Sequence, residues 1–479
     1  MPRFLLTSLA LLLAAASFAI EIPGKQIYIP EELRGNNFES DTAQWSYSRM
    51  ALTENFVIFW ERGFGNDLSN PPRLEGQPMA VDLQNLEQKL ERFYRFYRDT
   101  LHFIGSNSNA AKYRMMVLLN YSLDGTAYGG DYDEFIGAFW VAPNRLQDRT
   151  LNCVAHELGH SFQMQVHCDR KALAQQTDRR SSGAKDQFID TQDAEVPEQG
   201  RWFGGGFFEM TSQWMLWHVN SNWVRDENFH WTAYQQSAHK AFLHWANVYH
   251  SPYVLEWWSQ NHGLDVIGNI YKTAQNPEDP ADAFARLAKM QAAQFTDDLF
   301  EANRHTVFLD FRHAHSETRP YIGGFSTKFI DEQTGWRRTT PVKGGSWLRV
   351  APENAPETGG FNAIEMAKPE RGERVTVEFE GLTQVADTAY TLAHPELAAW
   401  RYGFVALMED GSCLYSPIYR KAHGQATFKA PGTKAIRQLY LVVMGAPTDR
   451  HAQAEDKEQR GHHRRQEADL QWPYRVRRL

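Results

Sequence analysis

The sequence VAHELGH at residues 154–160 is the feature that most constrains this chain, because it is an HExxH motif. Histidines four residues apart share one face of an α-helix, so His156 and His160 can bind one metal ion together. Glu157 stands beside them and can take a proton from a water whose pKa the metal lowers. The motif therefore predicts a Zn2+ site for peptide hydrolysis, with Glu157 as the catalytic residue.

A purely structural pair of histidines is the alternative interpretation of the motif. The apolar residues around it recur with helical spacing, at Leu151, Val154, Ala155, Leu158, Phe162 and Val166. This pattern indicates a largely buried helix. Because unpaired buried charge is costly, a metal ion is the simplest partner for a buried His-Glu-His cluster.

The third metal ligand decides the subclass of the site. A metzincin would continue with a glycine and a third histidine, but Gln163 and Val166 occupy those positions. We predict instead that Glu209 binds the metal, at the start of a helix that follows the glycines at 204–206. Gln213, one turn later, is expected to orient a ligand by a hydrogen bond. Four acidic residues of the intervening polar loop stay open as alternatives to Glu209: Asp190, Asp193, Glu195 and Glu198.

Several blocks of sequence carry a family resemblance. They are ENFVIFW at 54–60, IGAFWV at 136–141, AHELGHSFQ at 155–163, and the glycine-rich entry to Glu209. Over roughly residues 45–310, the chain resembles the secreted, gluzincin-like zinc metallopeptidases related to the Svx and AvrXca virulence proteins of plant-associated bacteria, a largely uncharacterised family. The resemblance implies a zinc metallopeptidase that acts outside the cell on host or wall glycoproteins, and it assigns no particular substrate.

The N-terminus predicts export. Arg3 precedes a mainly apolar run at 4–16, and Ser17-Phe18-Ala19 offers small residues to a signal peptidase, so we expect a signal peptide over 1–19. No later stretch approaches the roughly 20 apolar residues of a membrane span. The mature chain is therefore expected to be secreted, extracellular or periplasmic, with no membrane span. A formal net charge of -8 argues against nucleic acid as a partner.

Coarse patterns place a small sheet before the motif. Residues 54–60, 113–120 and 135–141 are predicted strands, and residues 82–101 are a predicted amphipathic helix. In such sheets an edge strand can hold an extended peptide, and residues 137–141 are the candidate, although an ordinary edge strand is an equal alternative. Three polar side chains farther along are candidate donors to the oxyanion of the reaction: Tyr234, His244 and Tyr249.

From about residue 318 the pattern becomes that of an antiparallel sandwich. Short apolar or alternating runs occur at 347–350, 362–366, 374–379, 402–408, 425–428 and 438–443. Such an accessory domain could contact carbohydrate, or it could be a structural support. The last segment is rich in charge of both signs, so we expect a disordered tail.

Taken together, the patterns predict an α+β protein with a zincin-like (gluzincin) metallopeptidase domain followed by a β-sandwich accessory domain. The expected boundaries are a signal peptide at 1–19, a linker or pro-segment at 20–45, the catalytic domain at 46–312, the sandwich at 313–446 and the tail at 447–479. The predicted function is a secreted zinc-dependent endopeptidase for proteins or glycoproteins. The alternatives are a catalytically weak glycoprotein- or cell-wall-binding protein on the same scaffold, and a zinc peptidoglycan amidase.

Overall fold

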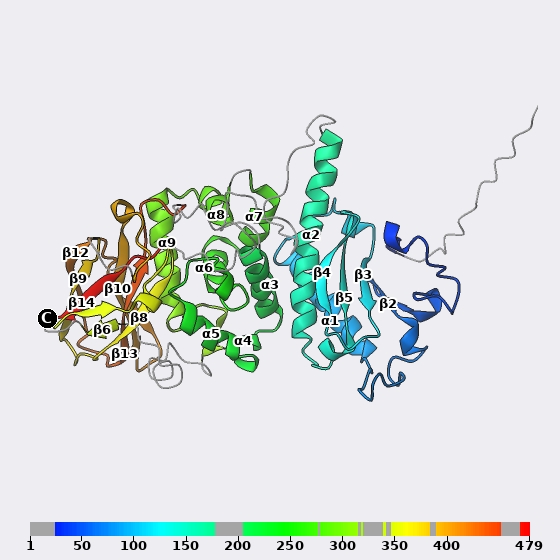
Figure 1. Cartoon of the computed structure of the whole chain (residues 1–479), viewed down its shortest axis with the longest axis horizontal. Helices are drawn as coiled ribbons and strands as arrows, with labels where there is room; N and C mark the ends of the chain where they lie inside the picture. Colours follow the sequence, from blue (N-terminus) through cyan, green and yellow to red (C-terminus); the bar gives the residue numbers. More distant parts are fainter. Residues whose placement is uncertain are drawn as a thin grey trace, which may run out of the picture.

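The computed structural model describes residues 24–177, 205–275, 278–314, 318–319, 339–341, 346–383, 389–451 and 470–479. In these residues the chain is an α+β protein whose parts follow one another in a row: a sheet with two long helices, a group of shorter helices, and a pair of sheets (Figure 1). The predicted signal peptide at 1–19 lies outside the described residues. So do Asp190, Asp193, Glu195 and Glu198.

The N-terminal sheet has five strands in the order β1-β2-β3-β5-β4. They are β1 (Met50–Leu52), β2 (Phe56–Trp60), β3 (Met115–Leu119), β4 (Ala127–Tyr132) and β5 (Ile136–Val141). Strands β2, β3 and β5 are parallel, and every residue of β2 and β3 is buried, which explains their unbroken apolar sequences.

Strand β5 lies between β3 and β4, so the prediction of an edge strand at residues 137–141 is wrong. The edge strand is β4, which pairs antiparallel with β5. Its sequence AYGGDY gave no strand signal because glycine is depleted in strands. Gly129 is nevertheless required there, since a side chain at this position would collide with the backbone of Glu157.

Two long helices, α1 (Leu83–Asp99) and α2 (Asn152–Thr177), pack against each other and against this sheet. The Tyr97 hydroxyl of α1 donates to the carbonyl of Ala155 in α2 at 2.9 Å. The described part of the expected linker or pro-segment is packed on the same domain, since the Phe38 ring lies 5.3 Å from that of Phe59 and only 7% of Phe38 is exposed.

The middle of the molecule is helical. It contains α3 (Gly205–Val219), α4 (Trp223–Asp226), α5 (Phe229–Ser237), α6 (Tyr253–His262), α7 (Val266–Thr273), α8 (Pro280–Leu287) and α9 (Ala292–Thr306). Four tryptophans of these helices are fully buried: Trp214, Trp217, Trp223 and Trp258. Among the described residues, no helix is long and apolar enough to cross a bilayer. Short 3-10 helices lie at Glu31–Leu33, Tyr47–Arg49, Arg62–Phe64, Asn109–Ala111, Pro143–Arg145, Trp245–Asn247, Pro352–Asn354 and Pro395–Leu397.

The C-terminal part is a pair of antiparallel sheets with the orders β11-β10-β13-β8 and β12-β9-β14-β7-β6. Their strands are β6 (Thr339–Pro341), β7 (Leu348–Val350), β8 (Phe361–Met366), β9 (Arg374–Gly381), β10 (Trp400–Met408), β11 (Cys413–Tyr415), β12 (His423–Lys429), β13 (Ile436–Gly445) and β14 (Tyr474–Arg478). Each of the six sequence runs predicted for this part contains a strand.

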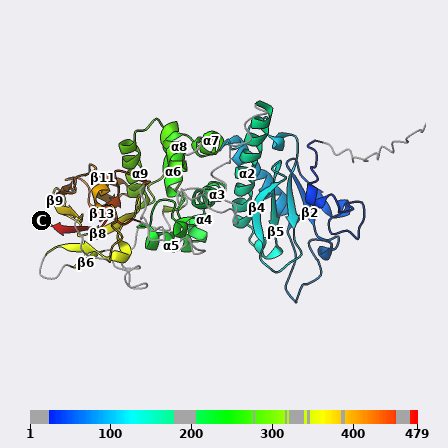
Figure 2. The ribbon, with the colours of Figure 1, turned by 45° about the horizontal axis from the view of Figure 1, so that its top comes forward.

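The first of these sheets is covered on both faces, because alternate residues of a strand point in opposite directions. On β13, Leu441 belongs to the core shared by the two sheets, whereas Tyr440 belongs to the core of the helical part. The Tyr440 ring lies 5.5 Å from Phe308, and Figure 2 shows β13 close to α9. This sheet is therefore built onto the helices, which supports a structural role for it.

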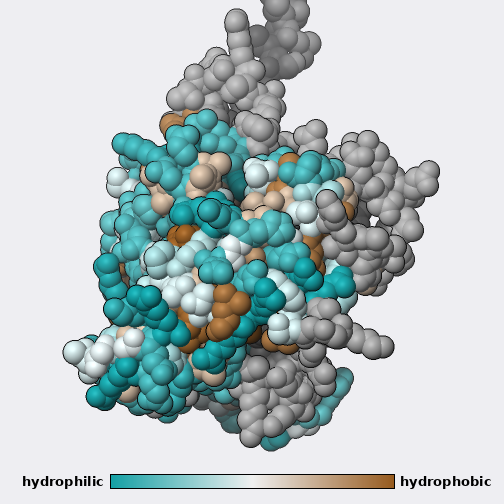
Figure 3. Space-filling model, turned by 90° about the vertical axis from the view of Figure 1, so that its left-hand side faces the viewer, coloured by the Kyte–Doolittle hydropathy of each residue, from teal (hydrophilic) through white to brown (hydrophobic). Residues whose placement is uncertain are grey.

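The outer face of the second sheet is polar. Arg475 pairs with Glu380 at 2.6 Å, and Arg477 pairs with Glu378 at 2.5 Å. At this end the molecule presents mainly hydrophilic residues with small hydrophobic spots (Figure 3).

The prediction of a disordered tail at 447–479 is wrong for its last ten residues. Strand β14 lies inside the second sheet, between β9 and β7. Trp472 and Tyr474 are fully buried, and only 3% of Val476 is exposed. These apolar residues alternate within a charged sequence, so the average composition concealed the strand. Residues 452–469 lie outside the described part.

Replacing Trp472 with alanine tests whether this strand completes the core. Its indole Nε1 donates to Thr358 Oγ1 at 3.1 Å. We expect Trp472→Ala to lower the free energy of unfolding by about 3–5 kcal/mol in a denaturant titration, because a large buried ring is lost. Trp472 lies two residues before β14, and Arg478→Ala, at an exposed position within β14, should change the free energy of unfolding by less than about 0.5 kcal/mol. Equal stability of the two variants would contradict the packing of β14.

Candidate metal centre

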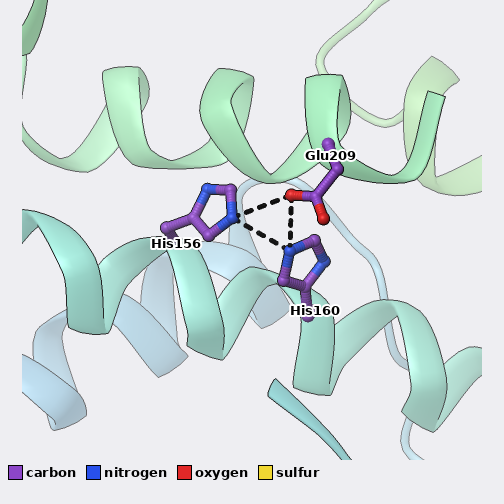
Figure 4. Close-up of side chains that lie close together, drawn as sticks. All are labelled: His156, His160 and Glu209. Carbon is purple, nitrogen blue, oxygen red and sulfur yellow. Dashed lines mark hydrogen bonds and ion pairs between the residues drawn. The ribbon is translucent and has the colours of Figure 1, made fainter. Parts of the chain in front are cut away.

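Three predicted site residues meet between α2 and α3 (Figure 4). The Oε2 atom of Glu209 lies 3.1 Å from Nε2 of His156 and 3.0 Å from Nε2 of His160, and the two Nε2 atoms are 2.9 Å apart. The side chains of His156, His160 and Glu209 are 12%, 5% and 13% exposed. The three atoms form a nearly equilateral triangle that is close to the protein surface but mostly shielded from water.

The two helices approach closely because the residues at their contact are small. Gly159, inside the HExxH motif, faces Ser212 of α3, and a Cβ at position 159 would collide with the Ser212 hydroxyl. That hydroxyl donates to the carbonyl of His156. The glycine in the motif is thus explained by packing, and it lets Glu209 reach the two histidines.

Two glutamines hold the imidazole rings. Gln213 Oε1 lies 3.1 Å from Nδ1 of His156, as expected from the sequence, and its Nε2 donates to the carbonyl of Tyr249 at 2.8 Å. Gln163 holds the ring of His160 in the same way. Its Oε1 lies 3.0 Å from Nδ1 of His160, and its Nε2 donates to the carbonyl of Phe208 at 3.0 Å. We did not predict Gln163 as a partner of His160 from the sequence, although its position three residues later on the same helix was the available signal.

These contacts fix where the ring protons lie. A carbonyl only accepts hydrogen bonds, so each amide NH2 must face the carbonyl and each amide oxygen must face a ring Nδ1. Nδ1 of both rings therefore donates, and in the neutral rings Nε2 is an acceptor. Three acceptor atoms then converge with no donor among them, which is the arrangement that a bound metal ion satisfies.

Glu209 is held in its ionised form. Burial raises its pKa, but when the two rings are protonated, the charges of His160 and His156 and their hydrogen bonds outweigh burial and hold the pKa of this carboxyl far below its usual value. A carboxylate rather than a carboxylic acid therefore faces the two rings.

Glu157 lies next to the triangle without joining it. Its Oε2 accepts a hydrogen bond from the backbone N–H of Gly129 in β4 at 2.7 Å, and 8% of the residue is exposed. A Cβ on Gly129 would also lie 2.7 Å from that of His160. The edge strand therefore runs directly along the metal-facing side of α2, and Glu157 stands between this strand and the two histidines.

Of the three candidate oxyanion donors, Tyr249 is the one that reaches the cluster. Its ring lies 5.9 Å from that of His156, and 37% of the residue is exposed. Burial, the charge and hydrogen bond of Glu209, and the charge of Glu157 all raise the pKa of Tyr249, so its hydroxyl keeps its proton. Tyr234 is 5% exposed and packs on Tyr253 in the core, and His244 accepts from the backbone N–H of Ala246.

A buried ion pair that the sequence argument missed anchors α3. His218 Nε2 lies 2.8 Å from Glu256 Oε2 of α6, and Trp214 Nε1 donates to the same oxygen at 3.1 Å. Burial raises the pKa of Glu256, but the charge and hydrogen bond of His218 outweigh it and lower this pKa. The pair fixes the helix that carries Glu209.

A second group of acidic and histidine residues has a different explanation. Asp279, Asp282 and His451 are close enough to share an ion. However, the Arg450 guanidinium binds both oxygens of Asp279, at 2.7 and 3.0 Å, and also contacts Asp282. This cation already neutralises the carboxylates, so the group ties α8 to the segment after β13.

The glutamine contacts lead to a prediction about metal affinity. Gln163→Leu and Gln213→Leu should each weaken binding of a divalent ion, measured by competition for Zn2+ against a chromogenic chelator, by about 10–100-fold. Gln165→Leu is a matched control, because Gln165 is fully buried on the same helix but contacts Gly137 and Asp169 instead of a ring. An equal loss of affinity in the control would contradict a specific role for the two contacts.

Residues 19–478 match the family described as "Family of unknown function (DUF6055)", and the chain belongs to that family. No curated protein matches the chain. Among solved structures, it is similar to a functionally unknown conserved protein from Bacillus anthracis str. Ames, with 10% sequence identity and a TM-score of 0.28 over 51% of this chain and 47% of that one. The chain thus spans about half the length of that protein, and a likeness this weak supports no conclusion about fold or function.

Proposed function

We propose that this member of the DUF6055 family is a secreted zinc endopeptidase of the gluzincin type that cleaves extracellular proteins or glycoproteins. The observation that carries the proposal is the convergence of His156, His160 and Glu209 beside Glu157. Export is inferred from the sequence of residues 1–19. The similarity to the Svx and AvrXca virulence proteins is a resemblance of sequence.

The donor set fits zinc. A tetrahedral site with bonds of about 2.0–2.1 Å has its ligand atoms about 3.3 Å apart. The observed separations of 2.9, 3.0 and 3.1 Å need to open only slightly to accommodate the ion. Three protein ligands leave a fourth position for water, as in catalytic rather than structural zinc sites. Zn2+ bound by these residues would supply Lewis acidity and lower the pKa of that water.

Glu157 is the proposed general base and then general acid. Its carboxylate can accept a proton from the attacking water and later deliver it to the leaving amine. The hydrogen bond from Gly129 fixes the direction of this carboxylate, so one oxygen is held and the other remains available. Tyr249, which keeps its proton, is the proposed donor to the oxyanion that forms on the scissile carbonyl.

The outer edge of β4, opposite β5, is the proposed place for the substrate backbone. The N–H of Gly129 points to Glu157 and not to β5, so the backbone groups of Ala127, Gly129 and Asp131 belong to the outer edge of the strand. An extended peptide that adds to this edge would run past Glu157 and the two histidines. Because strand addition binds a peptide through its backbone and needs no chain terminus, this arrangement favours an endopeptidase.

Two variants separate catalysis from metal binding. Glu157→Gln should retain one zinc per chain and lose about 10²–10⁴-fold in turnover of casein, because the proton carrier is removed but no ligand is lost. Glu209→Ala should lose zinc as well, because it removes a ligand. Metal content by mass spectrometry and peptide release measure the two effects.

Glu87→Gln is the matched control, since it makes the same change at a half-buried site on α1. Full activity of Glu157→Gln would contradict the proposed mechanism, and zinc retained by Glu209→Ala would contradict the ligand set. Zinc binding without cleavage of any protein would favour a binding protein on this scaffold, whereas release of muropeptides would favour an amidase.

A further inference from the structure

A row of aromatic side chains leads away from Tyr249 on the helical side of the metal centre. Phe229 begins α5, and its ring lies 4.1 Å from that of His230. The His230 ring in turn lies 4.9 Å from that of His250, the residue after Tyr249. We call Phe229, His250 and Tyr249, with His230 beneath them, the aromatic strip.

The strip is open to solvent. Phe229 is 59% exposed and Tyr249 is 37% exposed, whereas His230 is only 8% exposed and supports the others. Single exposed hydrophobic residues are common, but here Phe229 is linked through the His230 ring to His250, the residue next to Tyr249, and exposed rings so placed beside a candidate reaction centre are typical of a ligand subsite.

A buried chain of polar contacts holds the strip in place. Nδ1 of His250 lies 2.7 Å from Nδ1 of His230, and Nε2 of His230 lies 3.4 Å from Oε2 of Glu227. Glu227 also accepts from Asn152 Nδ2 at 2.8 Å and from Trp223 Nε1 at 3.0 Å. Asn152 lies one turn before His156 on α2, so the chain connects the strip to the helix of the metal ligands.

The exposed groups of the strip carry no charge at neutral pH. Burial and the charge of His230 lower the pKa of His250 to about 4. The nearby carboxylates already have partners, since Glu227 faces His230 and Asp226 pairs with Arg225 at 2.8 Å. An ionic substrate side chain would therefore find no unpaired counter-charge among these groups.

We propose that the aromatic strip is a substrate subsite that takes one large uncharged side chain, aliphatic or aromatic, of an extended peptide. The proposal rests on the proposed peptidase function. Gly129 contacts the face of α2 that carries the metal ligands from the side of the sheet, and Tyr249 contacts it from the side of the helices. A peptide paired with β4 would therefore direct alternate side chains toward the helical part of the molecule. The strip begins at Tyr249 and extends outward, which places the subsite next to the scissile bond or a few residues from it.

A panel of peptides tests this specificity. The parent is a ten-residue peptide that the wild type cleaves, with Leu, Phe, Ala, Gln or Glu placed in turn at each position within four residues of the cut. At one position, kcat/KM should be about 10–100-fold higher for Leu or Phe than for Ala. At the same position, kcat/KM for Gln and for Glu should be lower than for Leu or Phe. Phe229→Ser should reduce that preference by about tenfold, through a loss of kcat/KM on the Leu and Phe peptides.

Leu173→Ser is the matched control. Leu173 is exposed to the same extent, 60%, but lies near the far end of α2, about 25 Å along the helix from His156 at 1.5 Å per residue. This control should keep the full preference. Preference retained in Phe229→Ser, or lost equally in Leu173→Ser, would overturn the assignment.

A binding measurement separates the subsite from the chemistry. Calorimetric titration of the Leu and Ala peptides into zinc-loaded Glu157→Gln should show the same ratio of affinities, and adding Phe229→Ser should reduce that ratio by about tenfold. Tighter binding of a glycosylated peptide than of its unmodified counterpart at that position would overturn the proposal in favour of a sugar. If no wild-type cleavage were found but the Leu preference in binding were present, the peptidase function would fail and the subsite would stand.

Discussion

The close packing of α2 against α3 is the contact on which the candidate site depends. Three acceptor atoms can converge only because Gly159 lets the helices approach and because Gln163 and Gln213 turn both Nδ1 atoms away from the centre. When both rings are neutral, these acceptors face one another inside a poorly solvated space, which is unfavourable, and either a metal ion or protons on rings that pair with Glu209 relieve it. The rest of the fold holds the two helices in this arrangement, notably through the buried pair of His218 and Glu256. The packing of the fold therefore holds the three candidate metal ligands together.

The same packing connects the site to the surfaces that would meet a substrate. Gly129 brings the edge of β4 against α2 and directs Glu157, while the amide of Gln213 links His156 to the backbone of Tyr249. The sheet side of the centre is therefore positioned by a contact from α2, and the helical side by a contact from α3. A substitution in either contact should move a ligand and a substrate-facing group together.

The sequence was sufficient where local periodicity and local chemistry coincide. Helical spacing placed His156 and His160 on one face, and the glycines before Glu209 identified the start of α3. It was insufficient where tertiary packing overrides propensity. The glycines of β4 suggest a loop unless the close approach of α2 is known, and the arginines on either side of Val476 conceal a central strand. From the sequence, Gln163 was noted only because a metzincin has glycine at its position. Its contact with His160 was missed because the carbonyl that orients its amide, that of Phe208, lies on another helix.

The most direct measurement is the zinc K-edge X-ray absorption spectrum of the protein loaded with one equivalent of Zn2+. Two imidazoles, one carboxylate and one water predict a shell of four nitrogen or oxygen atoms at about 2.0–2.2 Å, with outer-shell scattering from two rings. Sulfur at about 2.3 Å would instead indicate binding by cysteine, and a shell of six oxygens would indicate a nonspecific surface site. Either of these results would contradict a metal centre built from His156, His160 and Glu209.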